Sequence, residues 1–190
     1  MNAFTILFLL ALLMSFGIEW WLMRRQIACV RIHRDNVPQA FQAAISLESH
    51  QKAADYTVDK AYVAEVERLT SLALLLLLTL GGGLETIRSF WVHFGGTSLW
   101  AGVATILSTL LLLQLIEIPA GYYRTFVVEQ KYGFNRNSPR QFFTDLALQT
   151  GLSLAIGIPL LGFILWIMDS VSYWWLWAWA VVMSVSIVMS

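Results

Sequence analysis

Long apolar runs separated by polar stretches are the main pattern along the chain. A helix needs about 20 apolar residues to cross the roughly 30 Å hydrocarbon core of a bilayer. In lipid such a run must be helical, because every backbone N–H and C=O group needs a partner within the segment. Five runs of suitable length predict five transmembrane helices, at residues 3–23, 69–90, 98–118, 148–168 and 171–189.

The connections between these runs differ in kind. Little more than Asp169 and Ser170 separates the last two runs, which predicts a tight helical hairpin, with a broken re-entrant element as the alternative. Residues 24–68 are too many for a mere connection. Apolar residues at helical spacing within them predict amphipathic helices, one of which starts near Asn36 and Pro38. The two apolar stripes are Phe41, Ala44 and Ile45, and Val58, Tyr62 and Val66.

Composition supports a membrane protein. Hydrophobic residues make up 58% of the 190 residues, against roughly 45–50% in a soluble domain. A small soluble domain leaves much of its surface in water and could not hide so much apolar area. We therefore predict an all-α, polytopic integral membrane protein that forms a single domain, residues 1–190, with lipid covering its exterior. The zero net charge gives no indication of a nucleic-acid partner.

The distribution of charge predicts the orientation. Eleven of the twelve Lys and Arg residues fall in or beside the two polar stretches 24–68 and 119–147, and only Arg88 falls on the other side. Positive residues accumulate in cytoplasmic loops. We expect both stretches in the cytoplasm and the N-terminus outside. The first apolar run lacks a basic leader and is too long for a cleaved signal peptide, so we expect it to be retained.

Three carboxylates fall within apolar runs, where a charge is costly. Glu85 has Arg88 three residues on, which predicts a local ion pair. Glu19 and Glu117 lie near the inner ends of their runs. For both, snorkelling or pairing is one interpretation and a wet cavity is the other. Glycines 81–83 predict close helix packing, and Pro159 predicts a kink or a packing point.

No catalytic constellation is present in the sequence. A zinc hydrolase needs a motif such as H-E-x-x-H, and the three histidines are far apart, at positions 33, 50 and 93. Cys29 is the only cysteine, so a disulfide and a cysteine-based zinc cluster are excluded. We expect neither a metal ligand set nor a catalytic residue in this chain.

The stretch "VVEQKYGFNRNS", residues 127–138, is unusually polar for this chain. Gly133 predicts a helix stop, and Ser138 with Pro139 and Gln141 predicts a capping box at the next helix start. This interpretation gives no reason for Glu129, Tyr132, Phe134 and Asn135.

A resemblance to a known protein family gives a reason for these four residues. The segment "IPAGYYRTFVVEQKYGFNRNSPRQFFTDL", residues 118–146, resembles the N-terminal membrane region of the type-1 CAAX prenyl protease family, and "SHQKAADYTVDKAYV" resembles a second stretch of it. The residues that carry the resemblance are Tyr56, Lys60, Pro119, Tyr123, Phe126, Glu129, Tyr132, Gly133, Phe134, Asn135 and Ser138.

The resemblance implies a zinc metalloendopeptidase whose membrane helices enclose a chamber for membrane-associated or lipidated peptides. It also implies a catalytic part with H-E-x-x-H, which this chain lacks before it stops at Ser190. We therefore expect the N-terminal membrane part of such a peptidase, inactive by itself, with the C-terminal catalytic part, peptides and membrane lipid as partners. We expect it in a bacterial inner membrane. The alternative is a self-sufficient small scaffold or carrier that uses Glu19 and Glu117.

Overall fold

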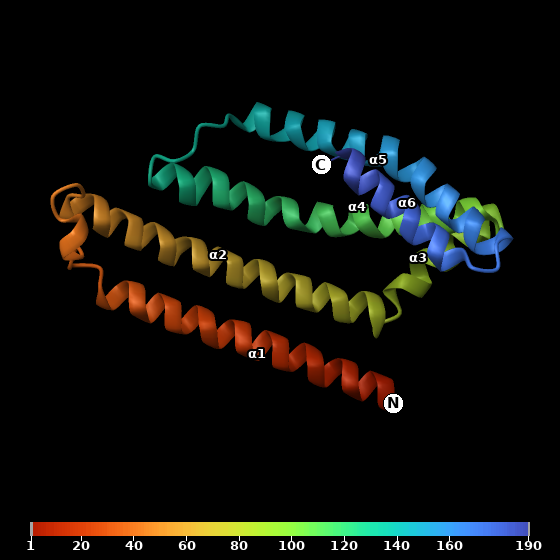
Figure 1. Cartoon of the computed structure of the whole chain (residues 1–190), viewed down its shortest axis with the longest axis horizontal. Coiled ribbons are helices and arrows are strands. Elements are labelled where there is room, and N and C mark those ends of the chain that lie inside the picture. Colours follow the sequence, from red (N-terminus) through yellow and green to blue (C-terminus); the bar gives the residue numbers. More distant parts are fainter. Residues whose placement is uncertain (1, 190) are drawn as a thin grey trace. The chain divides into compact units, whose positions relative to one another are not determined.

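The computed structural model describes residues 2–189, and within them the chain forms helices and no strands. Figure 1 shows their order along the chain. The elements are α1 (Ala3–Ile32), the 3₁₀ turn η1 (Gln39–Phe41), α2 (Leu47–Thr79), α3 (Gly83–Gly95), α4 (Leu99–Tyr123), the π-helix η2 (Arg124–Glu129), α5 (Pro139–Ser170) and α6 (Trp174–Met189). Met1 and Ser190, the ends of the predicted domain, lie outside the described residues.

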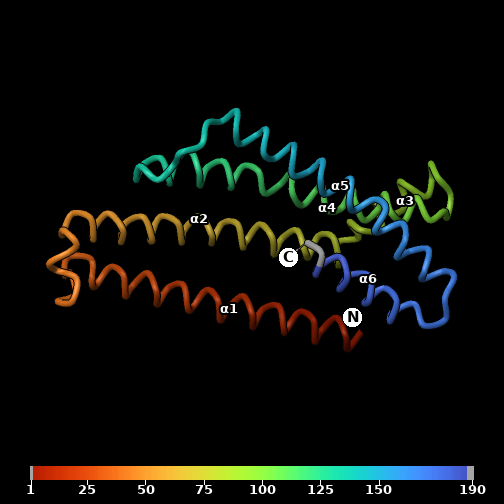
Figure 2. Tube along the Cα trace, turned by 45° about the horizontal axis from the view of Figure 1, so that its top comes forward, coloured from red at the N-terminus to blue at the C-terminus, as the bar shows by residue number. Residues whose placement is uncertain are grey.

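Contacts divide the chain into two units. Unit 1 holds the chain up to Ser71 together with Pro119–Asn137. It contains α1, the first part of α2, and η2 with the turn that follows. Figures 1 and 2 both show α1 and the first part of α2 side by side and antiparallel, joined by the turn around η1. Unit 1 carries most of the residues of the family resemblance.

Unit 2 holds Leu72–Ile118 and the chain from Ser138 onward. Its helices α4 and α5 pack closely, since a Cβ atom at Gly102 would lie 3.0 Å from Leu165 Cδ1. Gln114 Nε2 donates to Thr150 Oγ1 at 2.8 Å across the same pair. Such interhelical hydrogen bonds and small residues hold membrane helices together where the hydrophobic effect cannot.

The helices extend beyond the predicted spans. Helix α1 continues nine residues past Met23, and α5 begins nine residues before Leu148. Much of the predicted cytoplasmic loop 24–68 is therefore helical, as parts of α1 and α2. The predicted amphipathic helix after Pro38 is wrong: only the three-residue η1 forms there. Its apolar stripe has no partner to bury it, since Phe41 and Ile45 are both exposed.

The predicted span 69–90 is bent. Helix α2 ends at Thr79, α3 starts at Gly83, and the two axes differ by 55°. Gly82 has φ +76°, and a Cβ at Gly81 would lie 2.6 Å from Leu77 O. The glycine tract therefore breaks the helix, which corrects our prediction that it serves close packing. A residue without Cβ can adopt the left-handed backbone that this bend requires.

Three described helices are long and apolar enough to cross a membrane, and a fourth span results if the bent pair counts as one. The fifth predicted span corresponds to α6, which has 16 residues. It folds back against α5 after a turn at Val171–Tyr173, which is the predicted hairpin (Figure 1). Large apolar side chains such as Leu13 and Leu148 are exposed along the described helices. Lipid must cover them, as the composition predicts.

Candidate functional site

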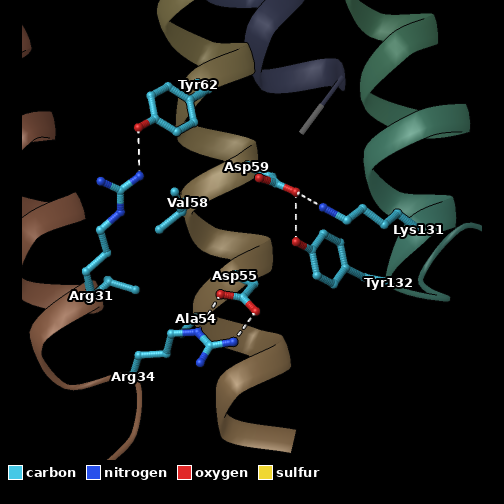
Figure 3. A pocket seen from close by; sticks show the side chains of 10 residues that line it. Arg31, Arg34, Ala54, Asp55, Val58, Asp59, Tyr62, Lys131 and Tyr132 are labelled. Carbon is cyan, nitrogen blue, oxygen red and sulfur yellow. Dashed lines mark hydrogen bonds and ion pairs between the residues drawn. The ribbon is translucent and has the colours of Figure 1, made fainter. Parts of the chain in front are cut away.

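The end of unit 1 formed by α1, α2 and the segment after η2 carries a pocket of about 510 Å³. Figure 3 shows its charged and phenolic side chains, which come from three separate segments. Helix α1 supplies Arg31, and Arg34 lies two residues after its end. Helix α2 supplies Asp55, Asp59 and Tyr62, and the segment after η2 supplies Lys131 and Tyr132. We call these seven residues the polar cluster.

Asp59 is the centre of the polar cluster. Its Oδ2 accepts hydrogen bonds from Lys131 Nζ and from the Tyr132 hydroxyl, both at 2.7 Å (Figure 3). Burial raises the pKa of Asp59, but the hydrogen bonds from Lys131 and Tyr132 and the Lys131 charge together bring it below 3.8. The carboxylate is therefore ionised at neutral pH, and it ties α2 to the chain segment that follows η2.

Asp55, one helical turn before Asp59, makes the second connection. Arg34 Nε and Nη2 donate to its two carboxylate oxygens at 2.7 and 2.8 Å. This fork geometry is the strongest form of an ion pair between these groups. The hydrogen bond from Arg34 lowers the pKa of Asp55. A third connection is the hydrogen bond from Arg31 Nη2 to the Tyr62 hydroxyl at 2.8 Å.

An aromatic cluster lies beside the polar cluster. Val63, Val128 and Tyr132 form a buried core, and Tyr56 packs against it. The Tyr56 ring meets the Tyr132 and Phe134 rings edge to face, at centroid distances of 5.5 and 4.9 Å. Each such pair contributes about 0.5–1.5 kcal/mol beyond the burial of its area. Three residues of the resemblance, distant in sequence, thus meet at one place.

The turn after η2 is closed by its backbone. Gly133 has φ +75°, and Glu129 O accepts from Phe134 N at 2.9 Å and from Asn135 N at 3.3 Å. The Asn135 side-chain oxygen then accepts from Asn137 N at 2.7 Å. Gly133 and Asn135 therefore shape the turn. The helix stop at Gly133 and the capping box of Ser138 and Gln141 are both confirmed.

The remaining residues of the resemblance lead into this turn. Pro119 lies inside α4 and Tyr123 is its last residue. Phe126 belongs to η2, and its ring lies 4.5 Å from that of Tyr122. Short π-helical stretches within longer helices are frequent at functional sites. Lys60 Nζ lies 5.7 Å from the centre of the Tyr56 ring, on a different side of α2 from the polar cluster.

The three carboxylates that fall within apolar runs have different surroundings in the structure. Glu85 pairs with Arg88 at 2.6 Å, which confirms the predicted local pair. Glu19 pairs with Arg68 at 2.9 Å. Glu19 also lines a pocket between α1 and α2, so the structure supports both pairing and a position at a cavity. Glu117 is an exposed residue of α4 and belongs to unit 2.

Acid–base or metal chemistry finds little support in this arrangement. Among residues 2–189 no three His, Cys, Asp or Glu side chains lie together as a metal site requires. The ion pairs keep the pKa of Asp55 and Asp59 low, so neither is a strong base. The polar cluster is suited to holding three chain segments together and to contacting a polar partner.

The sequence patterns pointed to only two of the seven members of the polar cluster. They were Tyr132, through the resemblance, and Tyr62, through its apolar stripe. Asp55 and Asp59 at i and i+4 on one face of a predicted helix were the available signal. Arg34 is 21 residues away from its partner Asp55 in the sequence, and Lys131 is 72 residues away from its partner Asp59. Periodicity carries no information about pairs so far apart.

Comparison with known proteins agrees with the motif. A sequence model described as CAAX prenyl protease N-terminal, five membrane helices, matches residues 26–190. The chain belongs to the CAAX prenyl protease N-terminal family. Together with the long apolar helices, membership makes it an all-α integral membrane protein, as predicted. The segments that form the polar and aromatic clusters lie within the matched range.

Relatives of this family share low but extended identity with the chain. The CAAX prenyl protease 1 homolog of Arabidopsis thaliana is 28% identical over 90% of this chain and 42% of its own length. CAAX prenyl protease 1 of Saccharomyces cerevisiae is 27% identical over 86% of this chain and 38% of its own length. The chain thus spans less than half the length of these relatives.

A solved structure shows the same fold. The crystal structure of S. mikatae Ste24p superposes with a TM-score of 0.84 at 22% identity, over 94% of this chain and 43% of that chain. The helical arrangement described above is therefore that of the N-terminal portion of a CAAX prenyl protease fold.

Proposed function

We propose that this chain is the membrane-embedded N-terminal part of a zinc metalloendopeptidase, a peptide hydrolase that acts on membrane-associated or lipidated peptides. The observation that carries the proposal is the family match over residues 26–190. In this proposal the helices wall the chamber that receives the peptide. The chain does not catalyse hydrolysis by itself.

Zinc would be held by residues outside this chain. The described residues do not fit a metal site, because no group of three candidate ligands is present among them. A chain that spans 42% of the Arabidopsis relative leaves ample length for a catalytic part with H-E-x-x-H. That part would contact the cytoplasmic end of unit 1.

Glu129 and Asn135 are the residues that we propose as contacts to the catalytic part. Their backbones shape the turn after η2, and no hydrogen bond or ion pair of the Glu129 carboxylate is present within the part of the chain that the structure describes. Because this carboxylate has no hydrogen-bond donor within the described residues and lies beside an ordered turn, it is suited to accept a hydrogen bond from the catalytic part. Lipid and peptide complete the set of partners in this proposal.

The membrane in this proposal is a bacterial inner membrane, with the N-terminus outside and residues 24–68 and 119–147 in the cytoplasm. The placement of eleven of the twelve Lys and Arg residues on one side of the predicted spans supports this orientation. The polar cluster would then lie in the cytoplasm, where the catalytic part would meet it.

The test is a cleavage assay on the full-length protein in membranes, with prenylated and unprenylated forms of one peptide. We expect cleavage that a zinc chelator abolishes and that zinc restores. A full-length protein without H-E-x-x-H, or cleavage indifferent to zinc, would contradict the proposal.

A variant pair tests the role of Glu129. We expect E129Q to lower the cleavage rate by about tenfold or more, since misplacing catalytic groups slightly has effects of this size. The matched control is E48Q, because Glu48 is exposed at the start of α2. Equal stability and activity of E129Q and E48Q would sink this assignment.

A further inference from the structure

A second pocket of unit 1, of about 540 Å³, lies between α1 and α2. Lys60, Arg68 and Glu19 form its charged lining, and its apolar lining includes Leu22 and Met23. None of the residues that line it belongs to the polar cluster. The proposed function leaves the pocket without a role.

The predicted spans indicate where this pocket lies relative to the membrane. The first apolar run ends at Met23 and the second begins at Leu69, so Glu19 and Arg68 lie at the same membrane boundary. Trp20 and Trp21 mark that boundary, because aromatic rings gather at headgroup level. The guanidinium groups of Arg24 and Arg25 lie 5.0 and 4.8 Å from the centres of these rings.

The charge of this pocket is positive. Arg68 Nε lies 2.9 Å from Glu19 Oε2, so one of the two cations has a carboxylate partner. Lys60 is exposed and has no carboxylate partner among the interactions of the described residues; its ammonium lies over the Tyr56 ring. The surplus charge is therefore one, and Lys60 carries it nine residues, or about 14 Å along the helix, before the predicted span that begins at Leu69.

We propose that this pocket binds the phosphate group of an anionic glycerophospholipid. Lys60 and Arg68 would contact the phosphate, and the acyl chains would run into the bilayer along Leu22. Basic pockets between membrane helices on the cytoplasmic side bind anionic headgroups. The site uses the proposed orientation and does not depend on peptidase activity.

A lipid fits this pocket better than a soluble anion does. Leu22, about half of whose surface is exposed, offers an apolar surface in the same pocket as the two cations. A free phosphate would gain nothing from that surface, whereas an acyl chain removes it from contact with water.

The experiment measures lipid retention by the full-length protein from nanodiscs that contain equal amounts of phosphatidylglycerol and phosphatidylcholine. Native mass spectrometry counts the lipids of each kind that stay bound. We expect K60Q to retain about fivefold less phosphatidylglycerol, since one Lys near an anionic surface has an effect of this size. The control K52Q, on the same helix but outside the pocket, should match wild type.

Glu19→Gln gives a change of opposite sign. It removes the carboxylate that competes for Arg68, so we expect greater retention of phosphatidylglycerol. A misfolded variant would not produce such a gain. If K60Q does not fold, E19Q decides alone, and unchanged retention overturns the proposal.

A third arm separates lipid from free phosphate. The reactivity of Lys60 toward an acetylating reagent is measured in detergent with added phosphatidylglycerol or inorganic phosphate. Protection by phosphatidylglycerol alone supports the lipid site. Protection by inorganic phosphate to the same degree, or equal retention of both lipids by wild type, overturns it.

Discussion

At the scale of single residues, Asp59 and Tyr132 connect α2 to the segment after η2. Tyr132 is buried with its ring in the aromatic cluster and its hydroxyl on Asp59 Oδ2. Its side chain therefore combines apolar packing with a polar tip, which is the usual arrangement of a buried tyrosine. Lys131 shares the same acceptor atom.

Tyr132→Phe should lower the free energy of unfolding by about 1 kcal/mol, because it removes one hydrogen bond and keeps the ring. The measurement is the thermal or denaturant midpoint of the purified protein in detergent. Tyr173→Phe is the control, since Tyr173 is 67% exposed. Equal midpoints for the two variants would show that the Tyr132 hydroxyl contributes nothing.

The same residues predict a dependence of stability on pH. Folding lowers the pKa of Asp55 and Asp59 below 3.8, so the unfolded state binds protons more readily. Their contribution to the free energy of unfolding is complete at pH values above the unfolded-state pKa. It is lost as pH falls through the lower folded-state pKa values. We expect the unfolding midpoint to drop in this acidic range and the drop to be smaller in a D55N/D59N variant. An identical acid profile in that variant would refute the assignment.

At the scale of elements, glycines with positive φ lie at two of the points where a helix stops. The α2–α3 break and the turn after η2 both use a glycine with positive φ, Gly82 and Gly133. A Cβ at Gly133 would have Lys52 Nζ at 3.8 Å as its nearest neighbour, which is ordinary contact. The requirement for glycine there is therefore conformational.

Gly133→Ala should destabilise the protein by about 1–2 kcal/mol, the usual cost of a left-handed backbone for a residue with Cβ. Gly133→Asn should cost less, because Asn tolerates this conformation. As a control, Gly151→Ala lies inside α5 with no atom within 4 Å of the added Cβ. It should stabilise by about 0.5–1 kcal/mol. The same sign for Gly133→Ala and Gly151→Ala would contradict this interpretation.

At the scale of the whole molecule, lipid and charge determine the arrangement. The described helices expose large apolar side chains along much of their length, and the basic residues gather on one side of the predicted spans. The first feature requires a bilayer, and the second supports the proposed orientation, in which the basic ends of the helices face the cytoplasm.

Cys29 provides a direct test of orientation, because it is the only cysteine and is exposed. It lies six residues past the predicted first span, or about 9 Å along the helix. A membrane-impermeant maleimide should label it in permeabilised cells and leave it unlabelled in intact ones. In a C29S/T97C variant, the cysteine at position 97 should be labelled in intact cells as well as in permeabilised ones. Labelling of Cys29 in intact cells would invert the proposed topology.

The sequence by itself determined the fold class and the family. Helix formation in lipid depends on local composition, so apolar runs of about 20 residues locate the membrane helices without any tertiary contact. The capping box at Ser138 and the stop at Gly133 are equally local, and the structure confirms both. The resemblance in residues 118–146 rests on consecutive residues, and the family match confirms it.

Only the tertiary structure decided which polar residues meet. Asp59 and Lys131 are 72 residues apart, and Glu67 and Arg124, which also pair, are 57 apart. Helical spacing gives the face on which each side chain lies, but the partner on that face depends on how the segments pack. The bend at glycines 81–83 is similar, since the same glycines are compatible with close packing or with a break. The structure shows the break, with Gly82 in the left-handed conformation.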